Sequence, residues 1–166
     1  NNGRVALNLP GTLKVSKIVK TNEGITAPDD TFEFTLTLEG EGSNASYYAT
    51  IFDAEGNPVE GFNGADQDNP YTIKSDKTFT LKNGQYIEVY GLPDGIKYSV
   101  VETSNTDYTT TNDSAEGATN AAEGTVAANE TVSVDYTNKF EVKDLTIDDT
   151  SSLFTAAKKL TGRDWT

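Results

Sequence analysis

Short runs of alternating apolar and polar residues recur along the chain, which is the pattern of half-buried β-strands. The alternation is clearest over 12–20 and 31–38. Further strands are predicted at 46–52, 70–74, 77–82, 85–92, 96–103 and 131–140. No helical periodicity competes with these runs before residue 150. The pattern therefore predicts an all-β domain.

Turn residues separate the predicted strands, because Gly, Pro, Asn and Asp favour the backbone angles of tight turns. Asn83-Gly84 lies between two alternating runs and is the strongest β-hairpin signal in the chain. Strands that follow one another every 8–12 residues or so are typical of a β-sandwich or a barrel.

Two segments depart from this pattern. Residues 104–130 are rich in Thr, Asn, Ala, Gly and Glu, and we predict a long mobile connection there with one strand near 108–111. Residues 153–160 fit a helix and a strand equally well, and periodicity alone does not decide between them.

Three polar residues fall on the apolar faces of predicted strands. Lys17 lies on the apolar face of the first strand, and Glu102 lies on the more apolar face of the strand before 104–130. Asn138 lies on the apolar face of the last strand, whose opposite face is wholly polar, so its inward direction is the firmest of the three. One Lys, one Glu and one Asn are thus predicted to point inward from three separate strands.

These three residues admit three interpretations, since a buried charge without a partner costs several kcal/mol. In the first interpretation, each residue lies at a strand end and its side chain reaches solvent. In the second, the Lys and Glu form a buried ion pair, and the Asn is their hydrogen-bond partner. The third interpretation is chemical. A neutral amine is a nucleophile, a carboxamide is an acyl group with ammonia as leaving group, and an acid between them transfers the proton. Burial favours this because it lowers the pKa of an amine and raises that of a carboxylic acid. The product would be an isopeptide bond between Lys17 and Asn138.

Composition narrows the range of functions. The 166 residues carry 26 acidic and 13 basic side chains, a formal net charge of −13, which argues against nucleic-acid and anionic membrane partners. The chain has no Cys, Met or His, which excludes thiol nucleophiles, disulfides, imidazole bases and Cys/His metal sites. We therefore expect no cofactor and no metal ion, and we expect core packing or some covalent device other than a disulfide to stabilise the fold.

Several segments resemble Gram-positive pilin isopeptide-linkage domains, which are relatives of the collagen-adhesin B-type (Cna B-type) stalk domains. The resembling segments are LKVSK at 13–17, FEFTL at 32–36, FTLKNG at 79–84, GLPDGIKYSVVE at 91–102 and YTN at 136–138. Each segment alone is weakly specific, and their order and spacing over 12–140 carry the resemblance. The run at 79–84, with the apolar residues after it, fits the central hairpin of that family.

The resemblance implies an all-β fold, a two-sheet Ig-like β-sandwich with adjacent first and last strands. It also implies that Lys17 is the nucleophile, Glu102 the catalyst and Asn138 the acyl partner, which are the residues that the strand faces select. The reaction would be a single autocatalytic turnover, so the chain is not expected to be an enzyme. The implied function is a structural stalk or shaft domain of a pilus or surface adhesin, extracellular and attached to the cell wall. Its partners would be neighbouring tandem domains or pilin subunits.

The resemblance also suggests a domain order. Residues 1–11 are predicted to be a linker, 12–141 the isopeptide-bearing domain, 142–152 a second linker, and 153–166 the first strand of a following similar domain or a C-terminal helix. In the first of these cases Lys158 would be the isopeptide lysine of that next domain. We then expect the chain to come from a tandem array.

Two other functions remain as alternatives. A ligand-binding adhesin module would use the aromatic and acidic stretch 47–71 for a glycan, a matrix protein or Ca²⁺, although a solvated loop is favoured there. The candidate site residues in that stretch are Asp53, Glu55, Asp66 and Asp68. A hydrolase would need paired carboxylates, and the adjacent pairs Asp29-Asp30 and Asp148-Asp149 lie on predicted turns, where such residues more often cap or face solvent.

Overall fold

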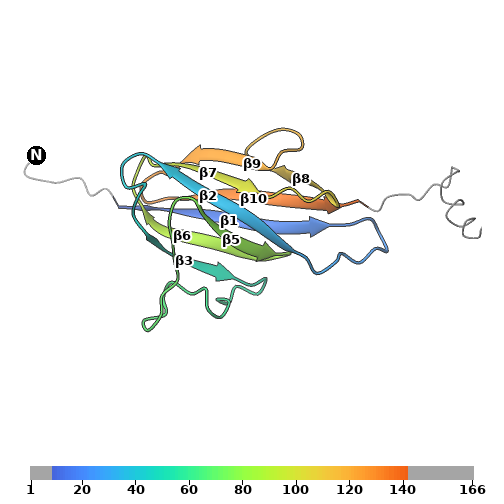
Figure 1. The fold of residues 1–166 in the computed structure, drawn as a ribbon, viewed down its shortest axis with the longest axis horizontal. Helices are drawn as coiled ribbons and strands as arrows, with labels where there is room; N and C mark the ends of the chain where they lie inside the picture. The colour runs from blue at the N-terminus through green and yellow to red at the C-terminus, as the bar shows by residue number, and fades with distance from the viewer. Residues whose placement is uncertain (1–8, 142–166) are drawn as a thin grey trace, which may run out of the picture.

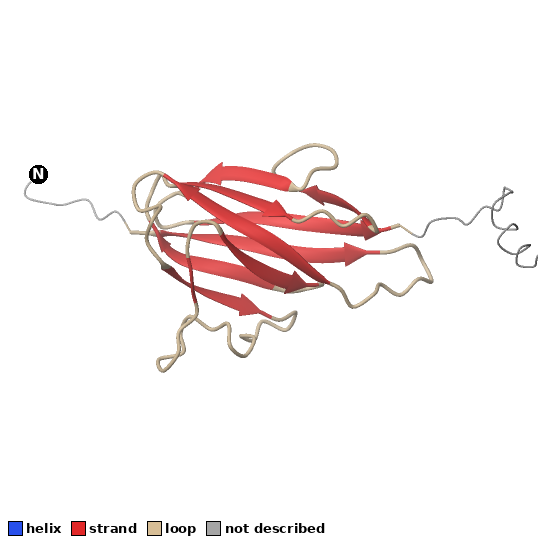
Figure 2. Ribbon diagram, in the orientation of Figure 1, coloured by secondary structure: helices blue, strands red, loops and turns tan. Residues whose placement is uncertain are grey.

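The computed structural model describes residues 9–141, whose regular elements are all β-strands (Figures 1 and 2). In chain order these are β1 (Gly11–Lys20), β2 (Thr31–Glu39), β3 (Tyr47–Phe52), β4 (Thr72–Ile73), β5 (Lys77–Lys82), β6 (Tyr86–Leu92), β7 (Lys97–Glu102), β8 (Tyr108–Asn112), β9 (Ala121–Thr125) and β10 (Thr131–Phe140). They form a six-stranded sheet in the order β4-β3-β6-β1-β10-β8 and a four-stranded sheet in the order β5-β2-β7-β9. The predicted all-β, Ig-like two-sheet sandwich is confirmed. Over these residues there is no helix of the length and apolarity that a membrane span requires.

The first and last strands are neighbours, as the resemblance implied, and the structure shows that they run parallel. β1 is flanked by β6 and β10 inside the larger sheet. Because β1 and β10 run in the same direction, the start of β1 and the end of β10 lie at opposite ends of the sandwich (Figure 1).

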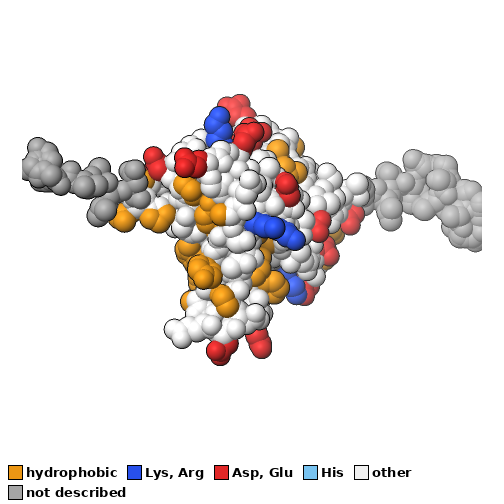
Figure 3. Space-filling view, turned by 60° about the vertical axis from the view of Figure 1, so that its left-hand side comes forward, with side chains coloured by type: hydrophobic (Ala, Val, Ile, Leu, Met, Phe, Trp, Pro, Cys, Tyr) orange, Lys and Arg blue, Asp and Glu red, His pale blue; other side chains and the backbone are white. Residues whose placement is uncertain are grey.

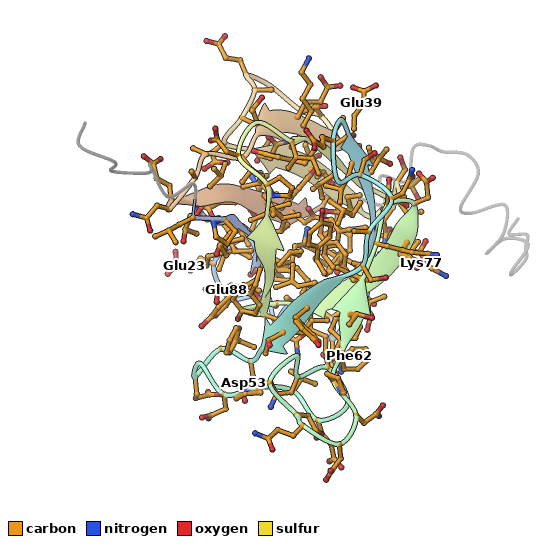
Figure 4. The ribbon with its side chains drawn as sticks, turned by 90° about the vertical axis from the view of Figure 1, so that its left-hand side faces the viewer. Glu23, Glu39, Asp53, Phe62, Lys77 and Glu88 are labelled. Atoms are coloured by element: carbon orange, nitrogen blue, oxygen red, sulfur yellow. The ribbon has the colours of Figure 1, made fainter. Side chains whose placement is uncertain are left out.

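A single apolar core fills the space between the sheets, as the view along the sandwich in Figure 4 shows. Strand alternation builds it, since every second residue of β2 is buried while its neighbours face outward. Each large apolar side chain that is fully buried contributes about 1.5–3 kcal/mol to folding. The core therefore holds the two sheets at a fixed separation.

The Asn83-Gly84 turn is present but does not make the predicted hairpin. β5 belongs to the four-stranded sheet and β6 to the six-stranded sheet, so the turn carries the chain from one layer to the other. Leu81 and Ile87 both bury completely, which requires their strands to face the same core from opposite sides. The turn bonds to β1 instead: Val19 N donates to Asn83 Oδ1 at 2.8 Å, and Gly84 N donates to the Lys17 carbonyl at 2.8 Å.

The predicted long connection over 104–130 is wrong, although the strand expected near 108–111 is β8. β9 also lies in this segment and pairs with β7 as an antiparallel edge strand. Its small residues hid it from prediction, yet they are what the packing requires. A Cβ on Gly124 would lie 2.3 Å from the Tyr98 hydroxyl oxygen, so a side chain there would collide with the core.

Residues 1–8 and 142–166 lie outside the described residues. They contain most of the first predicted linker, the whole second linker, the helix or strand at 153–166, Lys158 and the Asp148-Asp149 pair. The predicted domain boundaries therefore stay predictions.

Candidate functional site

Lys17 enters the core from the middle of the larger sheet. Leu13, Val15 and Lys17 occupy successive inward positions of β1 and are each at most 1% exposed. The Lys17 backbone is bonded to the turn that begins β6, since Lys17 N donates to Gln85 O at 3.0 Å and Gly84 N donates to Lys17 O. The amine thus extends into the core from a fixed point.

Asn138 lies on the same face of the neighbouring strand. In the parallel register Lys17 is opposite Tyr136, and Val19 is opposite Asn138. Asn138 is therefore one inward position further along β10 than the residue that faces Lys17, a separation that the long lysine side chain can span. Its side chain is completely buried.

Glu102 comes from the opposite sheet, at the end of β7, and is 1% exposed. Its carboxylate lies between the other two groups. Lys17 Nζ donates to Oε1 at 2.9 Å, and Asn138 Nδ2 donates to Oε2 at 2.5 Å. One carboxylate thus holds an amine and a carboxamide together, with a different oxygen bonded to each.

Aromatic side chains enclose the amine. Lys17 Nζ lies 4.2 Å from the centre of the Phe32 ring and 5.9 Å from that of Phe34. Burial lowers the pKa of Lys17 from 10.5 to about 8, and the hydrogen bond and charge of Glu102 offset only part of this effect. A pKa near 8 leaves about a tenth of the amines uncharged at pH 7, far more than for a lysine in water.

The Asn138 carbonyl oxygen has no hydrogen-bond partner. Among the described residues, Oδ1 is the buried side-chain atom left in this state. A buried unpaired carbonyl costs roughly 1–3 kcal/mol, so native structures seldom retain one without a reason. The Asn138 carboxamide therefore shares the Glu102 carboxylate with a buried amine, and its oxygen has no hydrogen-bond donor.

The structure brings together all three residues that the strand faces select. The interpretation in which each reaches solvent at a strand end is wrong, because none is more than 1% exposed. The ion-pair interpretation and the chemical interpretation share the observed geometry. Sequence reasoning missed Phe32 as a wall of the site and Asn120, whose side-chain amide donates to the Glu102 carbonyl at 2.9 Å. Phe32 alternated with polar residues like any core position, and Asn120 lay in the segment taken for a connection.

Two acidic residues of 47–71, Asp53 and Asp66, bond to the backbone of their own turns. Asp53 accepts from the backbone N–H groups of Glu55 and Asn57, and Asp66 accepts from Asp68 N at 3.0 Å, so both carboxylates cap turns. Asp53 and Phe62 lie at one rim of the sandwich in Figure 4, far from Glu39. In the described part of the chain no group of three His, Cys, Asp or Glu side chains could hold a metal ion.

The described aspartate pair is also divided between two roles. Asp29 forms an exposed ion pair with Lys82 at 3.5 Å, whereas Asp30 accepts from the Tyr108 hydroxyl at 2.6 Å. Two carboxylates with separate partners do not form the acid and base pair of a hydrolase.

Known proteins resemble this chain over the same strands. A family model described as "Domain of unknown function (DUF7601)" matches residues 11–140. No curated protein matches the chain. The solved major pilin of Streptococcus pyogenes is 25% identical with a TM-score of 0.58, over 78% of this chain and 47% of the pilin, and a variant of that pilin is 26% identical.

A solved pilus-presented adhesin is 20% identical with a TM-score of 0.58, over 82% of this chain and 28% of the adhesin, a likeness of fold alone. The chain thus spans about half the length of the pilin and less than a third of the adhesin.

Proposed function

Because the chain belongs to the DUF7601 family, whose description assigns no function, we propose its function from the buried site and the structural neighbours. The domain is a structural shaft or stalk unit of a Gram-positive pilus or surface adhesin. It carries an intramolecular isopeptide bond between Lys17 and Asn138, formed with the help of Glu102, as in the Cna B-type domains that its segments resemble. It is displayed outside the cell on a wall-attached protein, beside other pilin subunits or tandem domains.

One observation carries the proposal: a single buried carboxylate is hydrogen-bonded to both an amine and a carboxamide. Lys17 Nζ and Asn138 Nδ2 bond to opposite oxygens of Glu102. Reacting groups that the fold fixes in this way can reach effective molarities of roughly 10⁵–10⁸ M, and a poor electrophile such as an amide requires values of this order. The likeness to a pilin and to a pilus adhesin supports the placement on a pilus or cell surface.

The chemistry follows from the contacts. The Lys17 ammonium passes a proton to Glu102, and the free amine attacks Cγ of Asn138. A half-turn of the carboxamide about its Cβ–Cγ bond brings Oδ1 to the protonated Glu102, which stabilises the negative charge that develops on that oxygen. The Nζ–Cγ bond forms and the Cγ–Nδ2 bond breaks. Nδ2 leaves as ammonia with one proton, and the second proton released from Nζ stays on Glu102 or leaves with ammonia as ammonium.

Intact-mass spectrometry tests this proposal. We expect the wild-type mass to be lower than the sequence mass by one ammonia, and Lys17→Ala, Asn138→Ala and Glu102→Gln to have the full masses of their sequences. Lys20→Ala is the matched control, because Lys20 is an exposed lysine of the same strand, and it should still lose ammonia. Peptide mapping should find residue 17 joined to residue 138. A wild-type protein with its full sequence mass would contradict the proposal.

A further inference from the structure

Tyr136 joins the two sheets beside the buried site. Its side chain is completely buried, and its hydroxyl oxygen lies 2.7 Å from the Val100 carbonyl and 2.9 Å from the Asn120 carbonyl. Tyr136 precedes Asn138 by two residues on β10, and Val100 precedes Glu102 by two residues on β7. The hydroxyl therefore links the strand of the acyl group to the strand of the carboxylate.

Asn120 extends this link to Glu102 itself. Glu102 N donates to the Asn120 carbonyl at 2.8 Å, and the Asn120 side-chain amide donates back to the Glu102 carbonyl at 2.9 Å. The carbonyl that receives the Glu102 N–H is the same one that Tyr136 approaches. Both backbone polar groups of Glu102 are thus fixed by a residue that Tyr136 contacts.

We propose that the Tyr136 hydroxyl is a positioning group that sets the place of Glu102 relative to Asn138, so that the carboxylate stands between the amine and the amide. This inference rests on the proposed isopeptide reaction. Packing alone does not require the hydroxyl, because a phenylalanine ring at this position would make the same contact with Phe34. The centres of the Phe34 and Tyr136 rings lie 5.1 Å apart. A buried tyrosine hydroxyl needs a partner, and here one acceptor, Val100, lies on the strand of Glu102, and the other, Asn120, directly precedes β9, which pairs with that strand.

The hydroxyl remains a donor under working conditions. Burial, and to a lesser degree the charge of Glu102, raise the pKa of Tyr136 above its usual value, so the group stays protonated at neutral and mildly alkaline pH. The reacting groups must be held within about 0.5 Å of their productive positions for efficient chemistry. A hydrogen bond between β10 and β7 directly limits how far Asn138 and Glu102 can move apart.

The test is the rate of ammonia loss in Tyr136→Phe. Unreacted chains are recovered from inclusion bodies in urea, folding is started by dilution, and intact mass is followed over time, with circular dichroism to fix the folded fraction. We expect Tyr136→Phe to fold and to lose ammonia about tenfold more slowly than wild type, the effect of about one hydrogen bond on a barrier.

Tyr47→Phe is the matched control. Tyr47 is 9% exposed, its hydroxyl donates to the Gly42 carbonyl at 2.5 Å, and β6 separates its strand, β3, from β1 in the sheet. It should form the bond at the wild-type rate once folded. Urea unfolding of both variants in an Asn138→Ala background measures their stability costs without the bond. A merely structural role for Tyr136 would lower that stability and leave the rate in the folded protein unchanged.

Each result has a defined meaning. A wild-type rate in folded Tyr136→Phe overturns the inference while leaving the cross-link intact, whereas a wild-type protein that never loses ammonia overturns the proposed function and the inference together. If Tyr136→Phe does not fold, Asn120→Ala carries the test, since it removes the side-chain bond to Glu102 and keeps Tyr136. Slower ammonia loss in folded Asn120→Ala supports the positioning of Glu102 by Tyr136 through Asn120, and an unchanged rate overturns it.

Discussion

Glu102 has two tasks at the scale of single residues, because it balances the charge of Lys17 and also contacts Asn138. Its carboxylate and the Lys17 ammonium together hold one transferable proton. A buried ion pair of this kind contributes little to stability, since the cost of removing both charges from water offsets their attraction. In the proposed reaction, the pair rearranges to a neutral amine and a neutral acid without exchanging protons with solvent.

The pH dependence of cross-linking should reflect that shared proton. The pair keeps its proton below the Lys17 pKa of about 8 and loses it above. The reactive form needs an acid on Glu102, so the rate should be level near neutrality and fall by about tenfold per pH unit well above 8. Refolding of unreacted chains at a series of pH values, followed by intact mass, gives the profile.

Glu102→Gln provides the opposite expectation for the same experiment. That variant has no carboxylate to take the Lys17 proton, so any residual reaction should speed up as the Lys17 amine deprotonates with rising pH. A wild-type rate that also rises through pH 8 would show that the free amine alone limits the reaction and that Glu102 is not its acid.

At the scale of elements, the site depends on how three strands and one turn meet. The parallel register of β1 and β10 puts Lys17 and Asn138 on one face, and the opposing β7 supplies Glu102. The Asn83-Gly84 turn fixes the end of β1, and Gly84 adopts a φ of +89°, which only glycine adopts without strain. The turn that crosses between sheets is therefore part of the support for Lys17.

Gly84→Ala should both destabilise the domain and slow cross-linking. The left-handed backbone costs alanine roughly 1–2 kcal/mol, and the new Cβ would lie 2.9 Å from the Ala54 side chain. Gly117→Ala is the control, with a φ of +77° and open space around it, so it should show the backbone cost alone. Urea unfolding in the Asn138→Ala background measures stability. Equal losses of unfolding free energy in the two variants would show that the Asn83-Gly84 turn is packed no more tightly than an exposed loop.

Much of this arrangement is predictable from sequence, and the parts that are not have physical causes. Every second residue of a strand faces the same side, so the apolar residues two positions away identify Lys17 and Asn138 as inward-facing. Which sheet a strand joins depends on distant partners, so the Asn83-Gly84 turn gave the wrong pairing for β5 and β6. β9 and the adjacent Asn120 escaped prediction because β9 is built from small residues, with Gly124 against Tyr98, and the composition of this segment is that of a loop.

At the scale of the whole molecule, the cross-link would change the route of mechanical load. β1 begins at one end of the sandwich and β10 finishes at the other, so a pull on the chain ends acts along these two strands (Figure 1). The bond joins positions 138 − 17 = 121 apart, and in the chain-entropy description such a loop adds about 4–5 kcal/mol of stability. Acidic groups outnumber basic ones in the chain and are spread over the face in Figure 3, so the buried site lies beneath a highly charged, solvated exterior.

Single-molecule pulling on the two chain ends should separate the cross-linked from the unlinked domain. In the wild type the load passes along β1 to Lys17, crosses the bond and leaves through Asn138, so the residues between them stay folded and no large extension occurs. In Glu102→Gln, whose strands keep the same packing without the bond, unfolding should release the enclosed residues, an extension on the order of 400 Å for a fully stretched chain. Lys20→Ala, which keeps the bond, should behave as wild type. A large release from wild-type protein whose mass shows the bond would mean that the load does not pass through residues 17 and 138, and the domain would then be no better suited to a shaft than an unlinked sandwich.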